Sequence, residues 1–274
     1  MLMSTVFPTT GCRDYTIESR CRMVERVILK MQEQLDEPFS LKEMAKVAYL
    51  SPFHFNRVFH QVTGIPPTQF LYALRMEAAK RLLLMTHLRV MDVCYEVGYN
   101  SLGTFTTRFT QLVGLSPCQW RHLTECSLPL PTEATGESRQ PFPSPTSSGS
   151  YVEGWINVPP PHTKAIFVGL FPTRIPQCRP VAGAFLTSPG QYRIGPLPDG
   201  RYYLFAAALP VAMEPLTYLL PNTASLMVGS GQGPLMVKGG QVIGKTELNL
   251  RQVRLTDPPI LIALPSLLAG QLHV

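Results

Sequence analysis

The stretch "LKEMAKVAYLSPFHFNRVFHQVTGIPP", residues 41–67, decides the fold of the first half of the chain. Its apolar residues recur at helical spacing on both sides of a short turn. Ser51 stands directly after that turn, where a serine caps the start of a helix. The stretch therefore predicts one helix over 41–48 and a second over 52–62, which together make a helix-turn-helix.

The pattern occurs a second time further along the chain. A shift of 50 residues aligns the caps, ring positions and glycines of the two copies, pairing Ser51 with Ser101, Phe55 with Phe105, Phe59 with Phe109 and Gly64 with Gly114. Upstream of the caps the shift is 49, since the second turn has one extra residue. The second copy predicts helices over 90–97 and about 102–113.

Between the two copies, residues 67–86 predict a long amphipathic helix. Its expected apolar stripe consists of Leu71, Leu74, Ala78, Leu82 and Met85. At about 1.5 Å per residue this helix is about 30 Å long, close to the ~34 Å of one turn of B-DNA. Two helices joined by such a rod would fit successive major grooves on one face of a duplex.

Four separated motifs give this half a family resemblance: "LSPFHFNRVF", "TGIPP", "LRMEAAKRLL" and "VGYNS". In this order and at this spacing they resemble the DNA-binding domain of AraC/XylS-type transcription regulators, over about 100 residues. The resemblance implies a cytoplasmic regulator that binds double-stranded DNA at promoter sites, with no cofactor and no enzymatic activity. We expect an N-terminal extension at 1–20 and the all-α double helix-turn-helix domain at 21–123.

The helix over 52–62 has two faces. Phe55, Val58, Phe59 and Val62 form a core stripe, and the opposite stripe holds the candidate DNA-binding residues Phe53, Asn56, Arg57 and His60. Asn and Arg make forked contacts with adenine and guanine edges. In the resembled family, these positions contact bases and phosphates. For His60, a solvated or phosphate-facing role is an equal alternative, and an ordinary solvated face is the alternative for the whole stripe.

The second copy carries different chemistry on the same scaffold. Its core stripe is Phe105, Phe109 and Leu112, and its candidate DNA-binding residues are Gly103, Thr104, Thr106 and Thr107. Threonine reaches phosphates or thymine methyls but lacks the long fork of arginine. The family commonly has an arginine at the place of Thr107, whereas this chain has Arg108, rotated by about 100° toward the core boundary. We expect the first helix to read bases and the second to dock on the backbone.

Two further features concern the turns. Ser51 and Ser101 are predicted helix caps, and phosphate contact by either is an added possibility. Tyr49 stands where such turns usually carry glycine. If the backbone there needs a positive φ, tyrosine costs about 1 kcal/mol or more. An equal alternative is that the turn tolerates a tyrosine whose ring covers the adjacent core.

The second half follows different backbone rules, because 21 of the 27 prolines lie after residue 123. Residues 124–150 are rich in Pro, Ser, Thr and Gly and predict a flexible linker. From 151 to 274, short β-branched and aromatic runs alternate with turns such as "PLPDG" and "KGG". We expect an all-β sandwich of about seven strands. The fold class is therefore multidomain α and β.

The function of the sandwich is left open by the residues. "GPLPDGRYYLFAAAL" weakly resembles transthyretin-like or carboxypeptidase-regulatory-like β-sandwiches, which is a fold analogy only. Companion domains in AraC-like regulators usually bind an effector or form dimers. We therefore expect the sandwich to sense an effector, to form homo-oligomers, or both, and a possible small-molecule effector is unidentified. An anion site is one alternative to a solvated face for the scattered arginines Arg174, Arg179, Arg193, Arg201, Arg251 and Arg254.

Composition excludes several other classes. The net charge of +6 is mild, and no apolar stretch is long enough to span a bilayer. The six cysteines lack a C-x-x-C pair, which argues against a metal site or a disulfide scaffold. No catalytic constellation is present. The competing functions are an architectural DNA-binding protein whose sandwich only oligomerises and a DNA-repair methyltransferase, for which an N-terminal cysteine cluster is missing.

Overall fold

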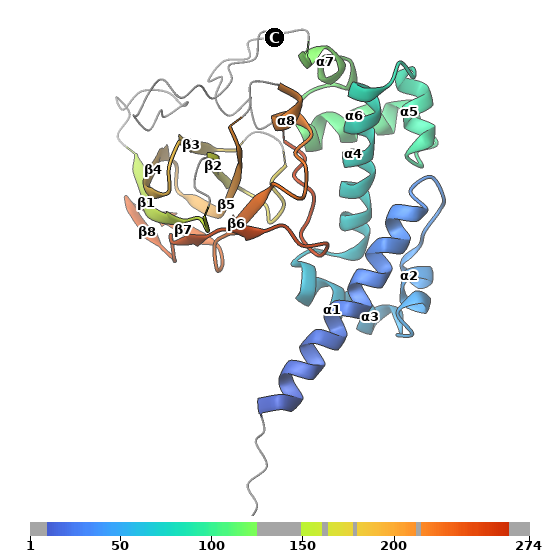
Figure 1. Ribbon diagram of the computed structural model, residues 1–274, viewed down its shortest axis with the longest axis horizontal. Helices are drawn as coiled ribbons and strands as arrows, with labels where there is room; N and C mark the ends of the chain where they lie inside the picture. Colours follow the sequence, from blue (N-terminus) through green and yellow to red (C-terminus); the bar gives the residue numbers. More distant parts are fainter. Residues whose placement is uncertain (1–9, 125–148, 161–163, 178–179, 212–214, 263–274) are drawn as a thin grey trace, which may run out of the picture. The chain divides into compact units, whose positions relative to one another are not determined.

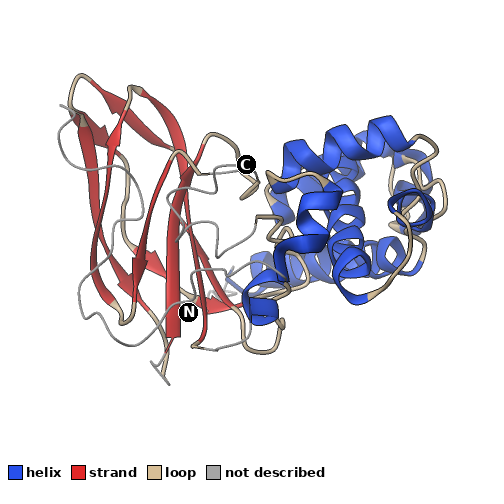
Figure 2. Ribbon diagram, turned by 90° about the horizontal axis from the view of Figure 1, so that it is seen from above, coloured by secondary structure: helices blue, strands red, loops and turns tan. Residues whose placement is uncertain are grey.

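A computed structural model describes residues 10–124, 149–160, 164–177, 180–211 and 215–262 of the 274-residue chain. Helices fill the first half and two β-sheets fill the second (Figures 1 and 2). The expected fold class, an all-α helix-turn-helix region followed by an all-β sandwich, is confirmed. The linker expected at 124–150 lies almost entirely outside the described residues.

The helices follow the order that the repeat predicts. They are α1 (Thr10–Glu33), α2 (Leu41–Val47), α3 (Pro52–Thr63), α4 (Pro67–Met85), α5 (Val90–Glu96), α6 (Leu102–Val113) and α7 (Pro117–Arg121), followed by the 3₁₀ turn η1 (His122–Thr124). The helix α1 begins at Thr10, inside the segment expected to be an N-terminal extension. Each of the five helices predicted from the repeat ends within one residue of its expected bounds.

Local capping explains these bounds. Ser51 Oγ accepts the His54 N–H and Ser101 Oγ accepts the Thr104 N–H, each at 3.4 Å, so the two caps form the same hydrogen bond. At the other end, Gly64 and Gly114 adopt φ of 79° and 90°, the left-handed conformation that glycine adopts without steric cost. The sequence repeat is therefore also a repeat of the capping interactions at both ends of the helix.

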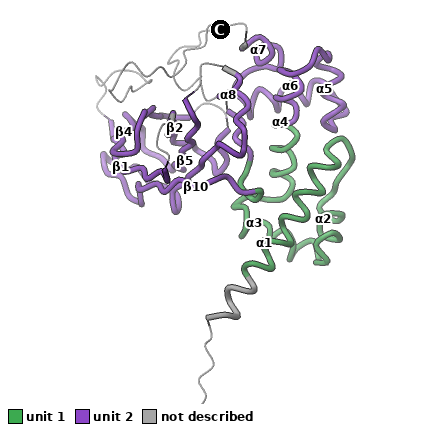
Figure 3. Tube along the Cα trace, viewed as in Figure 1, with its two compact units in different colours: residues 1–75, 255–258 green, residues 76–254, 259–274 purple. Residues whose placement is uncertain are grey.

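The chain divides into two compact units, and the division falls inside α4 (Figure 3). Unit 1 contains residues up to Arg75 together with Leu255–Pro258, and unit 2 contains Met76–Arg254 and the residues from Pro259 onward. In unit 1, α1, α2 and α3 bury an apolar core around Ile28, Met44 and Phe59. In unit 2, α5, α6 and α7 bury Val93, Cys94, Phe105, Phe109 and Trp120.

The single apolar stripe expected on α4 is wrong. Leu71 and Leu74 are buried, but Ala78 and Leu82 are only half-buried and Met85 is 62% exposed. Buried positions occur around the whole helix, at Phe70, Leu71, Ala73, Leu74, Met76, Ala79, Lys80 and Leu83. The reason is that α4 belongs to both units: one end is buried in the first core and the other end in the second.

The sandwich has ten described strands, more than the seven or so expected. They are β1 (Ser150–Asn157), β2 (Lys164–Phe171), β3 (Ala182–Leu186), β4 (Gly190–Leu197), β5 (Gly200–Pro210), β6 (Met227–Ser230), β7 (Leu235–Lys238), β8 (Gln241–Ile243), β9 (Leu248–Asn249) and β10 (Arg251–Gln252), with the short helix α8 (Pro215–Leu219) between β5 and β6. The extra strands are two to four residues long. Runs this short lack a periodicity that a sequence could reveal.

The strands form two sheets that share a core. One sheet has the order β4-β1-β9, and the other has the order β10-β6-β5-β2-β3, with β7 and β8 added along the N-terminal part of β5. Side chains such as Val152 and Ile194 from the first sheet pack with Val168 and Leu204 from the second. The outer face of the second sheet has its own apolar cluster, which includes Phe167 of β2 and Tyr218 of α8.

In the ranges that the structure describes, no helix combines the length and apolarity that a membrane span requires. The cysteines placed there are Cys21, Cys94 and Cys118, and all three are free thiols. Burial raises the pKa of the Cys94 thiol above its usual value, because the thiolate would be poorly solvated there.

Candidate nucleic-acid interface

The helix α3 presents the two faces that its sequence predicts. Phe55, Val58 and Phe59 are buried, with the Phe59 ring in edge contact with Phe55 and with Phe70 of α4, at centroid distances of 5.5 Å for both pairs. The opposite face is exposed and holds the four predicted candidates Phe53, Asn56, Arg57 and His60. Phe53 is 82% exposed, which is unusual for a large apolar side chain.

The end of the core stripe differs slightly from the expectation. Val62 is half-buried, whereas the next residue, Thr63, is buried. Thr63 is tolerated in the core because its Oγ1 donates to the Phe59 carbonyl at 2.9 Å, so its hydroxyl is not left unpaired. The end of α6 shows the same difference: Leu112 is half-buried, and the next residue, Val113, is buried.

The helix α6 repeats the scaffold with a different surface. Phe105 and Phe109 are buried, and Phe109 packs against Trp120 of α7 at 6.4 Å. Ser101, Gly103, Thr104 and Thr107 are exposed as predicted, but Thr106 is half-buried. Arg108 is also half-buried, as expected from its rotation toward the core boundary. The structure thus leaves Thr104 and Thr107 as the most accessible threonine candidates.

The second helix of each helix-turn-helix motif, α3 and α6, lacks acidic residues. The sequences "PFHFNRVFHQVT" of α3 and "LGTFTTRFTQLV" of α6 contain no Asp or Glu, whereas the preceding helices carry Glu43 in α2 and Asp92 and Glu96 in α5. Glu43 and Asp92 are engaged locally, and Glu96 is exposed at the end of α5. Glu43 accepts the Ser40 backbone N–H, which lowers its pKa, and Asp92 pairs with Arg89. An anionic ligand approaching α3 or α6 therefore meets no carboxylate on the helix itself.

One exposed apolar side chain at this surface was missed by the sequence reasoning. Leu102, the first residue of α6, is 41% exposed. It aligns with Pro52 at the start of α3, and at that place in the helix an apolar side chain has no preceding turn to pack against. Helical spacing alone does not reveal this exposure, since Leu102 stands three residues before Phe105 and so falls on the core stripe.

The turn before α3 carries the tyrosine at a positive φ. Tyr49 adopts φ of 56°, and Gly98 in the second turn adopts φ of 77°. In both turns the following residue closes a bond to the carbonyl five residues earlier, from Leu50 N–H to Ala45 and from Tyr99 N–H to Cys94, each at 3.0 Å. This pairing is the helix-ending motif that favours glycine in the left-handed position. The first turn therefore has the same geometry as the second, with a tyrosine in place of the glycine.

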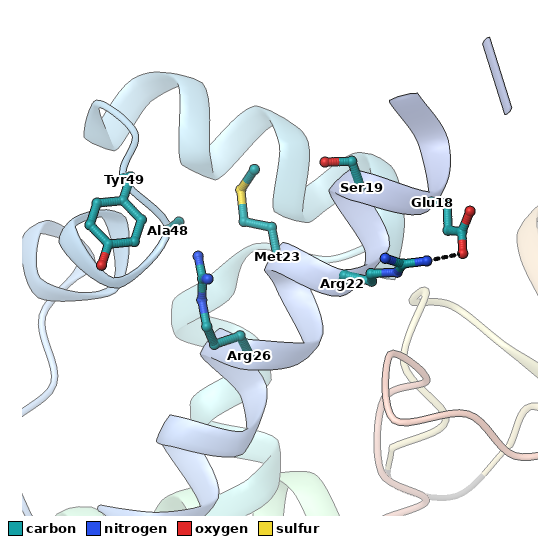
Figure 4. A pocket seen from close by; sticks show the side chains of 7 residues that line it. All are labelled: Glu18, Ser19, Arg22, Met23, Arg26, Ala48 and Tyr49. Atoms are coloured by element: carbon teal, nitrogen blue, oxygen red, sulfur yellow. Dashed lines mark hydrogen bonds and ion pairs between the residues drawn. The ribbon is translucent and has the colours of Figure 1, made fainter. Parts of the chain in front are cut away.

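The Tyr49 ring does not cover the core, so that alternative is wrong. The side chain is 85% exposed and lies under the guanidinium of Arg26 from α1, which is 5.4 Å from the ring centroid. Arg26 also donates from Nη2 to the Val47 carbonyl at 3.1 Å. These residues line a shallow cavity of about 360 Å³ that continues along α1 past Met23 to the Glu18–Arg22 ion pair (Figure 4).

Comparisons with known proteins cover the helical half. The family model described as "Helix-turn-helix domain" matches residues 44–122. The HTH-type transcriptional activator RhaR of Escherichia coli strain K12 is 31% identical over 101 residues, which is 37% of this chain and 36% of RhaR. The chain thus spans about a third of the length of these curated relatives.

Two solved structures are similar over the same region. The DNA-binding domain of AdpA, solved in complex with a target DNA, is 32% identical, with a TM-score of 0.35 and coverage of 36% of this chain and 88% of that one. The C-terminal domain of the response regulator AraT from Geobacillus stearothermophilus is 30% identical, with a TM-score of 0.36 and coverage of 41% and 90%.

Proposed function

Starting from the AraC-type helix-turn-helix domain that residues 44–122 form, we propose that the chain is a sequence-specific transcription regulator that binds double-stranded DNA through α3 and α6. We take the DNA-binding domain as 21–123 and assign effector sensing or oligomerisation to the sandwich at 151–274. The observation that carries the proposal is the exposed stripe of α3, where a phenylalanine, an asparagine and an arginine face solvent on a helix without carboxylates.

We assign the two helices different roles. Arg57 and Asn56 present forked donors that match guanine and adenine edges in the major groove, and Phe53 suits a thymine methyl. The exposed groups of α6 are shorter: Thr104 and Thr107 suit phosphate oxygens, and Leu102 adds a second candidate for a methyl contact. We therefore assign recognition of the bases mainly to α3 and contact with the DNA phosphate backbone mainly to α6.

The test is selection of binding sites from randomised duplexes with the full chain at fixed salt. Arg57→Ala should lower discrimination at the bases that Arg57 contacts by about 1–3 kcal/mol, since a forked contact to a base is removed. Thr107→Ala should weaken binding to all sequences alike, because a phosphate contact carries no sequence information. Arg193→Ala, which removes one exposed arginine from the sandwich, is the charge-matched control.

The reverse result would refute this division of roles. If Arg57→Ala leaves the selected sequence unchanged while Thr106→Ala or Thr107→Ala abolishes the preference, then α6 is the main reader. Genomic mapping with and without the sandwich addresses the competing architectural function. Protection of a few defined promoters supports a regulator, whereas uniform, salt-sensitive coverage supports a DNA-organising role.

A further inference from the structure

The described residues cover the outer face of the larger sheet over only part of its length. Along β5 the side chains of odd-numbered residues point to this face. Ala207 and Leu209 are buried in the cluster that contains Tyr218 of α8, Leu226 and Ile262. Toward the start of β5 the same face opens, since Tyr203 is half-buried and Arg201 is exposed. The sheet thus continues beyond the segments that cover it.

Strands β7 and β8 extend this open part. Arg201 is paired with Met236 of β7, and Met236 is paired with Ile243 of β8, so the three side chains lie in a row on one face. Met236 is 44% exposed and Ile243 is 62% exposed. Their neighbours Val237 and Val242 point to the opposite face, toward the sandwich core. Alternation therefore places two apolar side chains in solvent beside an arginine.

Three cations accompany these apolar groups. The guanidinium carbons of Arg174 and Arg201 each lie 5.6 Å from the centroid of the Tyr203 ring, so one aromatic ring holds two arginines in place. Lys238 is exposed on β7, two residues beyond Met236 and hence on the same face. We define this surface by its six residues, Arg174, Arg201, Tyr203, Met236, Lys238 and Ile243, and call it the open patch.

The open patch has no carboxylate of its own. Strands β5, β7 and β8 contain no Asp or Glu. The nearest acidic residue along the chain, Asp199, directs both carboxylate oxygens to the Gly239 backbone N–H, each at 3.0 Å. On the other sheet, the comparable arginine–tyrosine contact of Arg193 over Tyr151, at 4.2 Å, is neutralised by the Arg193–Glu153 ion pair. Asp199 keeps its negative charge and offsets at most one of the three cations. Among the described residues, Arg174, Arg201 and Lys238 form no ion pair, so the patch keeps a net positive charge for a ligand.

We propose that the open patch binds an acidic amphipathic segment of another protein. Carboxylates on the segment would pair with Arg174, Arg201 and Lys238, while its apolar side chains would cover Met236 and Ile243. The positive charge of the open patch favours an anionic partner. The exposed Met236 and Ile243 favour a partner with apolar side chains, which the phosphate backbone of a duplex lacks. This inference concerns the sandwich alone and does not depend on how α3 and α6 bind DNA.

The probe is a short labelled peptide of glutamate, alanine and leucine with the leucines at helical spacing, titrated against the full chain by fluorescence anisotropy. We expect the peptide to bind, and Arg174→Ala with Arg201→Ala to weaken it about tenfold or more by removing two charge-assisted contacts. Met236→Ser with Ile243→Ser should weaken it roughly fivefold, since the apolar contact is lost. Arg193→Ala, the matched arginine of the other sheet, should leave the affinity unchanged.

Two variants of the probe and two competitors decide the nature of the partner. A peptide with serine in place of leucine should bind clearly more weakly, and one with lysine in place of glutamate should not bind. The proposal is overturned if the serine peptide binds as tightly as the parent or if both double variants bind normally. It is also overturned if a random-sequence duplex or phosphatidylserine vesicles displace the peptide in an Arg201-dependent way, which would make the patch a nucleic-acid or lipid surface.

The double variants change exposed side chains only, and their thermal unfolding midpoints serve as the folding control. If the arginine variant unfolds, the Met236/Ile243 variant still tests the apolar half independently. Binding of a selected DNA site is measured on the same protein samples. Normal DNA binding by a patch variant that has lost the peptide would separate the two sites, whereas loss of DNA binding alone would count against the proposed function only.

Discussion

At the scale of single residues, Tyr49 shows how a backbone demand can be read from a repeat. Its counterpart Gly98 has the same left-handed conformation, and alignment of the two turns identifies the position where a side chain is strained. What the sequence could not show is where the tyrosine ring goes. Its contact is with Arg26 of α1, more than twenty residues earlier, and such a pairing has no periodic signal.

Substitution of Tyr49 separates the backbone strain from the ring contact. Tyr49→Ala keeps the strain and loses the stacking on Arg26, so it should lower the free energy of unfolding by about 0.5–1 kcal/mol. Tyr49→Gly also loses the ring but removes the strain, and it should be more stable than the alanine variant by about 1 kcal/mol. Urea unfolding of both variants measures the difference. Equal stabilities would mean that the turn does not strain a side chain.

At the scale of secondary-structure elements, the helices were predictable because their ends are marked by local chemistry. A serine before each recognition helix and a glycine after it define α3 and α6 to within a residue. The outward stripes were also predictable, because helical period alone assigns Phe53, Asn56 and Arg57 to the face opposite Phe55 and Phe59. The half-burial of Thr106 was not, because it depends on neighbours that helical period does not specify.

The two caps allow a matched test of structural and phosphate-binding roles. Ser51→Ala and Ser101→Ala should each lower the free energy of unfolding by about 1 kcal/mol, since both hydroxyls form the same hydrogen bond with a backbone N–H. Aspartate is an equally good cap, so Ser51→Asp and Ser101→Asp should be about as stable as the parent chain.

DNA affinity then reports the second role, by titration of a selected duplex at fixed salt. An aspartate beside a phosphate repels it, so the aspartate variants should bind more weakly while remaining fully folded. An aspartate variant that binds DNA like the parent chain would restrict that serine to capping.

At the scale of the whole molecule, the sequence predicted the class of each half but not the details of the sandwich. Turn residues and β-branched runs located the long strands, whereas β8, β9 and β10 have two or three residues each and exist only through their pairing partners. The open patch likewise depends on strand pairing and not on a local sequence pattern. Arg201, Met236 and Ile243 are far apart in sequence, and only strand register brings them into one row.

Lys80 of α4 makes the stability of the folded chain depend on pH. Its side chain is 2% exposed, with Nζ donating to the Ile260 carbonyl at 3.0 Å and lying 4.8 Å from the centroid of the Trp120 ring. Burial lowers the pKa of this ammonium group to about 8, partly offset by the attraction of Glu77. The unfolded chain therefore holds this proton at pH values where the folded chain has released it.

The sign follows from that difference in bound protons. Between about pH 8 and 10.5 the unfolded state binds more protons at Lys80, so the free energy of unfolding should rise with pH, by up to about 3 kcal/mol over the full window. Burial raises the pKa values of the Cys94 thiol and the Tyr192 hydroxyl, which act in the opposite direction. The contribution of Lys80 is therefore obtained as the difference in free energy of unfolding between the parent chain and Lys80→Met at each pH.

The measurement is urea unfolding of both proteins from pH 7 to 9.5. The difference in stability should change with pH for Lys80→Met and should stay constant for Lys42→Met, which removes an exposed lysine of α2. A constant difference for Lys80→Met as well would mean that its amine keeps an ordinary pKa in the fold.

The duplicated frame with two unlike outward stripes makes each half of the DNA-binding domain separately exchangeable. Gly103 occupies the place of Phe53, and a Cβ atom added there would lie 3.9 Å from Ser101 Oγ, an ordinary contact distance. Thr107, at the place of Arg57, is exposed. Phenylalanine and arginine grafted at these two positions would give α6 two of the outward side chains of α3. Under the roles proposed for α3 and α6, a change in the outward side chains of one helix would alter the DNA target while the other helix and both hydrophobic cores stay unchanged.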